Sequence, residues 1–245
     1  MTRYRAILEY DGADFLGFQR QAVGRTVQGE VETALGRLGW PGRTIWGAGR
    51  TDAGVHASGQ VIAFDFDWRH GAEALGRALN ANLPFDVAAH DLAACETSFH
   101  PRYSARARRY RYTFYNQPER SPLARRFAWQ VWPALDVAGL QAASAGLLGR
   151  HDFASFGTDP DEGANTVRTV SRAEWSVAPG GWLYFEIEAE AFLQRMVRSL
   201  VGALRRVGAG ELAPDGLAAL LAARDRSLCP PVAPPQGLCL VAVVY

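Results

Sequence analysis

The pattern of apolar and polar positions predicts strands and helices along the whole chain. Residues 3–10 (RYRAILEY) carry apolar side chains at alternate positions, which is typical of a half-buried strand. In residues 27–38 the apolar positions recur at helical spacing, and Thr26 is a suitable N-cap. We predict further strands at 43–48, 60–66, 87–94, 108–115, 168–177, 182–189 and 238–245. Further helices are predicted at 71–81, 136–148, 192–207 and 214–223, the last with Pro214 in its first turn.

This order of elements favours an α+β fold over a doubly wound parallel sheet, because several strands follow one another directly. The 245 residues allow one large domain or two of about 120 residues. We place a boundary at Phe99-His100-Pro101, which divides the chain into an N-terminal half, 1–100, and a C-terminal half, 101–245.

The chain shows neither a signal peptide nor a membrane span. Its first twelve residues include four charged side chains, and its apolar runs fall short of the roughly 20 residues that a span needs. The cysteines, Cys95, Cys229 and Cys239, form no CxxC pair and suggest no disulfide framework. We therefore expect a cytoplasmic protein without membrane partners.

Composition removes several kinds of enzyme. All 26 basic residues are arginine, so a Schiff-base lysine, a P-loop lysine and a pyridoxal site are excluded. The sequence has no HExxH or GxSxG motif. Gly47-Ala48-Gly49 begins like a dinucleotide fingerprint, but Gly54 comes two positions too late. Nothing in the sequence requires a metal or a nucleotide cofactor.

The formal net charge of +1 hides two basic segments. Residues 98–126 hold eight arginines and a single acid, Glu119, while residues 192–206 hold four arginines and no acid. The near-neutral total is an average over these segments and an acidic remainder. If both segments face one cleft, they form the electrostatic footprint of an RNA site.

Residues 47–57 (GAGRTDAGVHA) combine three glycines with charged side chains between two predicted strands, where ligand sites are common. Taken alone, Asp52 is explained by turn chemistry, in which its side chain accepts a local hydrogen bond. Taken alone, His56 is explained as a histidine that makes a structural hydrogen bond. Spacing by itself therefore leaves the role of Asp52 open.

The complete string, followed by GQVIAF, resembles the signature of the tRNA pseudouridine synthase A (TruA) family. Further blocks resemble the family in family order over nearly the full chain. They are Tyr10-Asp11-Gly12 with Gly17-Phe18-Gln19-Arg20-Gln21, Asn80-Ala81-Asn82-Leu83-Pro84, Phe99 to Ala105 with Arg108 to Tyr112, His151-Asp152-Phe153 with Ser155-Phe156, Met196-Val197-Arg198 with Val201-Gly202, and Pro234 to Leu238.

The resemblance implies a pseudouridine synthase fold, in which a mixed, mainly antiparallel sheet with flanking helices forms two related halves around a central cleft. It implies isomerisation of uridine to pseudouridine at positions 38, 39 and 40 in the anticodon stem-loop of tRNA. The family works as a homodimer and needs no metal or redox cofactor.

The resemblance also assigns roles to residues. Asp52 is the catalytic carboxylate, which either attacks ribose C1′ or helps to remove a ribose proton. Arg198 pairs with Asp52 and favours its ionised form, although helical spacing alone would make it a solvated charge. Tyr110 and Tyr112 share one face of the predicted strand, so spacing does not distinguish them. The position in the family motif makes Tyr110 the active-site tyrosine. We assign Arg50 to RNA contact as a substrate-binding residue that fills the space left by the displaced base. We assign RNA contact to Arg108, Arg109 and Arg195.

Two other functions remain open. The chain could be a noncatalytic RNA-binding module on the same scaffold, or another glycosidic-bond enzyme, such as a nucleoside hydrolase, that uses Asp52. The intact Asp52, Tyr110 and Arg198 favour an enzyme over the binding module. The absence of a clustered acidic metal site from the sequence weighs against many hydrolases.

Overall fold

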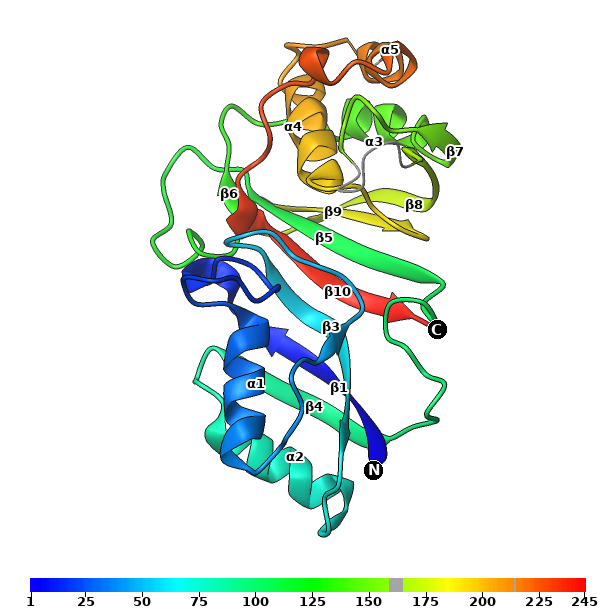
Figure 1. The fold of residues 1–245 in the computed structure, drawn as a ribbon. Coiled ribbons are helices and arrows are strands. Elements are labelled where there is room, and N and C mark those ends of the chain that lie inside the picture. Colours follow the sequence, from blue (N-terminus) through cyan, green and yellow to red (C-terminus); the bar gives the residue numbers. More distant parts are fainter. Residues whose placement is uncertain (159–164, 214) are drawn as a thin grey trace. The chain divides into compact units, whose positions relative to one another are not determined.

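A computed structural model describes residues 1–158, 165–213 and 215–245, and its elements are labelled in Figure 1. In these residues the chain forms ten strands and five α-helices, and most strand pairs are antiparallel, which confirms the predicted α+β class. The chain divides into two compact units. The first comprises residues 1–106 and 239–245, and the second comprises residues 107–238. The division into halves 1–100 and 101–245 concerns domains that fold independently, and it stays a prediction.

The sheet of the first unit has β1 (Thr2–Tyr10) between β4 (Val87–Ala94) and β3 (His56–Phe66), both antiparallel to it. The terminal strand β10 (Leu238–Val244) pairs with β3 in parallel, so the end of the chain returns to the sheet in which the chain begins. The short β2 (Trp46–Gly47) also pairs with β3.

Helices α1 (Val27–Arg37) and α2 (Gly71–Asn82) pack against each other, and α2 packs on β4 (Figure 1). Thr26 caps α1 as predicted: its side chain accepts a hydrogen bond from the Gly29 amide. The apolar stripes of the two helices are buried at Val27, Val31, Ala34, Leu35, Leu75 and Leu79.

The sheet of the second unit runs β5 (Ala107–Tyr115), β9 (Trp182–Ala189), β8 (Val167–Ala178) and β7 (Gly149–Asp152), with β6 (Trp129–Gln130) parallel to β5. The alternation of β5 gives it two faces. Tyr110, Tyr112 and Phe114 are buried, whereas Arg109 and Arg111 lie opposite Glu188 and Glu186 of β9. Opposite charges at facing positions support this register.

In the described part of the second unit the α-helices are α3 (Val137–Ala145), α4 (Met196–Gly208) and α5 (Gly216–Ala223). Helix α3 packs on α4 and β8, and α5 packs on α4 (Figure 1). Short 3-10 turns lie at Gly12–Asp14, Arg226–Leu228 and Pro235–Gly237. No helix in the described ranges is long and apolar enough to cross a membrane.

The predicted helix over 192–207 was wrong in its first turn. Arg195 has a left-handed backbone with φ of 61°, which ends the preceding extended segment and cannot continue a helix upstream. The Gln194 amide instead donates to the Thr158 carbonyl at 3.0 Å. The predicted position of Pro214 lies outside the described residues.

Other boundaries also differ from the predictions. The predicted strand 43–48 is reduced to two residues, and β3 begins four residues earlier than predicted. Strands β6 and β7 were not predicted, because two to four residues are too short to show a periodic pattern.

Candidate active site

Asp52 lies half-buried in the loop between β2 and β3, in a tight backbone turn. The Val55 amide donates to the Asp52 carbonyl at 3.1 Å, and Gly54 has φ of 77°. A positive φ at the third position of such a turn requires glycine. A turn therefore exists at this position, and the backbone carbonyl of Asp52 accepts the hydrogen bond that closes it.

Thr51, the residue before Asp52, is held in place by the last residue of β1 and by the loop that follows β1. Thr51 is buried, its hydroxyl shares a hydrogen bond of 2.8 Å with the Tyr10 hydroxyl, and its carbonyl accepts from the Phe18 amide at 3.1 Å. At the base of the loop, the fully buried Gln60 donates to the Gly49 carbonyl at 2.8 Å. These bonds hold the backbone on both sides of Arg50 and directly before Asp52.

Gly17 allows the close approach of this anchor. It has φ of 99°, and a Cβ there would lie 2.6 Å from the Thr51 carbonyl oxygen. Only glycine combines this backbone with such a contact at no steric cost.

His56, at the start of β3, is also buried and accepts from the Gly12 amide at 3.0 Å through Nδ1.

We expect Gly17→Ala to lower activity more than its loss of stability explains. The left-handed backbone alone costs alanine about 1–2 kcal/mol, or roughly 2–8 °C in Tm. The new Cβ would also displace Thr51 and the neighbouring carboxylate, which should slow a single turnover about tenfold or more. Gly39→Ala is the matched control, because Gly39 has φ of 85° and open space around it. Equal losses of activity in the two variants would contradict this role of Gly17.

Arg50, two residues before Asp52, is exposed, and its Nε donates to Oε1 of Gln19 at 3.1 Å. This bond directs the stem of the side chain toward the loop that follows β1. The bond involves Nε, so the two Nη groups form the outer end of the side chain.

The two tyrosines on the inner face of β5 have different surroundings. Tyr110 is 9% exposed and meets Phe192 edge to face, with ring centroids 5.1 Å apart. Tyr112 is fully buried against Phe114, and its hydroxyl donates to the Pro234 carbonyl at 2.8 Å. Burial raises the pKa of Tyr112, so this hydroxyl stays protonated at neutral pH. The geometry therefore gives Tyr112 a packing role. Spacing alone could not say which of the two tyrosines has that role.

Arg198 lies in the first turn of α4 and is half-buried. Its Nε donates to the Ala233 carbonyl at 2.8 Å, and the Ala233 amide donates to the Arg198 carbonyl at 3.0 Å. Gly202, one turn later, makes room for this segment, since a Cβ there would lie 2.2 Å from the Pro231 carbonyl. Sequence reasoning missed Ala233, whose only sequence signal was the nearby family block that begins at Pro234.

The predicted RNA-binding arginines differ in their contacts. Arg109 pairs with Glu188 at 2.8 Å, and Arg108 donates to the Glu190 carbonyl at 2.7 Å. Arg195 is exposed at the left-handed position before α4. The basic charge counted along β5 is thus partly balanced by glutamates of β9, which a count along the chain does not reveal. Within the described residues, no group of three His, Cys, Asp or Glu side chains could hold a metal ion.

Comparison with known proteins defines the class. The family model described as tRNA pseudouridine synthase matches residues 6–104 and 143–245, which include Asp52, Arg198 and the whole loop between β2 and β3. The chain is therefore an RNA-modifying isomerase that converts uridine to pseudouridine in tRNA.

Full-length relatives narrow the class to one family. Proteins named tRNA pseudouridine synthase A from Pseudothermotoga lettingae and Geotalea uraniireducens are each 42% identical to it, and one from Moorella thermoacetica is 44% identical. Each alignment covers all of this chain and all of the relative. The chain belongs to the tRNA pseudouridine synthase A family, which confirms the resemblance found in the sequence.

Proposed function

We propose that this isomerase acts on uridines 38, 39 and 40 of the anticodon stem-loop, with Asp52 as its catalytic carboxylate. The observation that carries the proposal is the loop of residues 47–57. This loop has the family signature, and it holds a half-buried carboxylate on a backbone anchored at Gly49 and Thr51.

The reaction exchanges one glycosidic bond for another. The bond from N1 of the base to ribose C1′ breaks, the base rotates, and a bond from C5 to C1′ forms. C5 loses its proton to solvent and N1 gains one, so the step is redox-neutral. Asp52 either attacks C1′ or helps to remove a ribose proton. Both roles use a negative charge beside the sugar, where positive charge develops as the first bond breaks.

The other site residues have supporting roles in this proposal. Arg198 pairs with Asp52, and the Tyr110 ring stacks on the extruded base. Arg50 fills the space that the base leaves. Arg108, Arg109 and Arg195 contact the RNA backbone, for which the planar guanidinium suits phosphate. The half 1–100 then contributes the carboxylate, and the half 101–245 contributes the tyrosine strand and the arginine helix.

The remaining parts of the proposal concern the protein's setting. We propose that the enzyme works in the cytoplasm as a homodimer with tRNA as its substrate, and without a metal or redox cofactor. These statements rest on the family resemblance and on the absence from the sequence of the usual cofactor motifs.

Tritium release from tRNA transcripts labelled at uridine C5 tests the function. We expect release without free uracil, and we expect it to disappear when positions 38, 39 and 40 of the transcript carry cytidine. Free uracil would instead support a glycoside hydrolase. Binding of the transcript without tritium release would support the noncatalytic RNA-binding module. Release that persists in the cytidine transcript would contradict the proposed target positions.

A further inference from the structure

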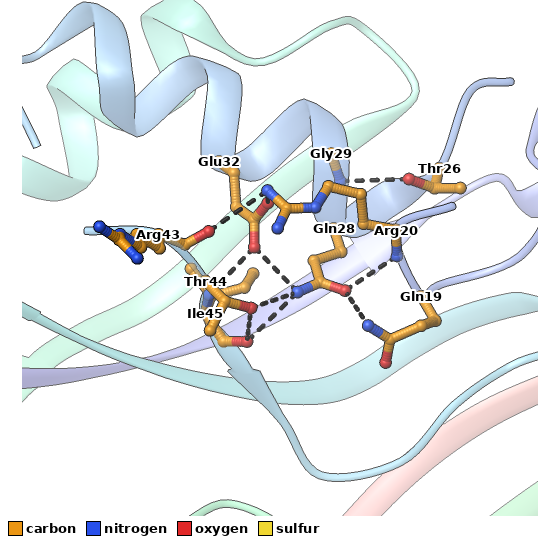
Figure 2. A network of polar contacts seen from close by, with 9 residues as sticks. All are labelled: Gln19, Arg20, Thr26, Gln28, Gly29, Glu32, Arg43, Thr44 and Ile45. Atoms are coloured by element: carbon orange, nitrogen blue, oxygen red, sulfur yellow. Dashed lines mark hydrogen bonds and ion pairs between the residues drawn. The ribbon is translucent and has the colours of Figure 1, made fainter. Parts of the chain in front are cut away.

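Two polar side chains of α1 point into the first unit rather than toward solvent. Gln28 is 2% exposed and Glu32, one turn later, is 9% exposed. Figure 2 shows that they join a continuous network with the loop after β1: Gln28 Nε2 donates to Glu32 at 2.8 Å, and Gln28 Oε1 accepts from Gln19 at 2.7 Å. The Arg20 amide donates to the same Oε1 at 2.9 Å.

Glu32 and the backbone groups next to Gln28 together fix how the Gln28 amide is oriented: the Arg20 amide only donates to its oxygen, and the Ile45 carbonyl only accepts from its NH₂ group, at 3.4 Å. A carboxylate that is ion-paired only accepts, so Gln28 has to turn its NH₂ group toward Glu32 and its oxygen away. That oxygen in turn requires the NH₂ group of Gln19. The remaining oxygen of Gln19 then faces Arg50, whose Nε donates to it at 3.1 Å. The buried carboxylate and the Arg20 amide thus orient Gln28, Gln28 orients Gln19, and the oxygen of Gln19 is the acceptor for Arg50.

Glu32 is well supported in this role, because donors surround both of its oxygens. Arg20 Nη1 donates to Oε2 at 2.7 Å, and the Ile45 amide donates to Oε1 at 3.1 Å (Figure 2). Compensation of this kind offsets much of the cost of burying a charge. The Ile45 bond also ties the network to the chain that enters β2, and the loop with Arg50 and Asp52 follows β2 directly.

We propose that Glu32, Gln28 and Gln19 form a relay that positions the Arg50 guanidinium for the reaction. This inference rests on the proposed function, which assigns Arg50 to the space of the displaced base. An exposed arginine loses much rotamer entropy when it is held in one place. A directed acceptor at Nε would reduce that loss before the base is extruded. The three residues act through Arg50 and are positioning residues.

A double-mutant cycle tests the coupling. Gln28→Met keeps the volume and unbranched shape of the side chain but removes both ends of the amide. We expect Gln28→Met and Arg50→Ala each to slow a single turnover about tenfold, and the double variant to be no slower than Arg50→Ala alone. Thr33→Ala, at an exposed position of α1, should keep the wild-type rate. Multiplying effects in the double variant would overturn the relay.

A measurement on the free protein separates the relay from the reaction. In protein with ¹⁵N-labelled arginine, the Nε–H resonance of Arg50 is the one that disappears in Arg50→Lys. We expect its exchange with water to accelerate about tenfold in Gln28→Met, and also in Gln19→Met, which removes only the exposed last link. Unchanged exchange in both would overturn the relay. A wild-type turnover in Arg50→Ala would instead overturn the role of Arg50 in the proposed function, whatever the resonance shows.

Discussion

Asp52→Ala is expected to abolish tritium release from tRNA labelled at uridine C5, with a loss of about 10³-fold or more in single-turnover rate. No other carboxylate occurs between Glu32 and Asp65, so the loop offers no substitute. The change leaves the backbone hydrogen bond of the turn in place, because it is the Asp52 carbonyl that accepts from the Val55 amide. Stability should therefore change little, and transcript binding should be retained.

Two variants sharpen this result. Asp52→Asn keeps the shape of the side chain and removes its charge, and we expect it to be as inactive as Asp52→Ala. Asp67→Asn removes an exposed carboxylate of the same unit just after β3, and it should keep the wild-type rate. If Asp52→Ala released tritium at the wild-type rate, the assignment of the catalytic carboxylate would be wrong.

Arg198→Ala is expected to lower the single-turnover rate by about 10²-fold or more while transcript binding weakens far less. The guanidinium is held by the Ala233 carbonyl, so it is already oriented before substrate arrives. Preorganised charge of this kind contributes mainly to the chemical step. Rates are measured with saturating enzyme, and binding is measured separately by filter retention of the transcript.

The controls for Arg198 separate charge from geometry. Arg198→Lys keeps the positive charge but lacks the planar guanidinium and its Nε donor, so we expect only partial recovery of the rate. Arg206→Ala removes another arginine of α4, which lies 3.5 Å from Glu211, and it should leave the rate unchanged. Complete loss of transcript binding in Arg198→Ala would contradict a mainly catalytic role.

The local pattern of the sequence was sufficient for most of the elements. The bounds of β4 and β9 agree with the predicted strands, and Thr26 caps α1 as its residue type predicts. These features depend on neighbours within a few positions, which the sequence shows directly. The start of α4 was predicted wrongly because Arg195 takes a left-handed backbone where residue 194 meets Thr158, a distant part of the chain.

In the candidate site, too, some features could be predicted from neighbouring residues and others depend on distant parts of the chain. The string of residues 47–57 was enough to indicate the loop, the family and Asp52, since its residue types and spacing are contiguous. Tyr110 and Tyr112 could not be told apart by spacing, because a period of two places both on one face. Their difference depends on Pro234, which comes 122 positions after Tyr112 and receives its hydroxyl hydrogen bond.

By itself, the sequence determined that this chain is an α+β enzyme of the tRNA pseudouridine synthase A family, and it located the loop that carries the proposed carboxylate. Only the tertiary structure decided how the side chains are held: Arg198 by Ala233, Arg109 by Glu188, and Arg50 by the side-chain amide of Gln19. Strand register brings Glu188 to Arg109, and the packing of irregular segments brings the other two partners close. Such contacts leave no periodic trace along the chain, because they join segments whose separation in sequence carries no information about their distance in space.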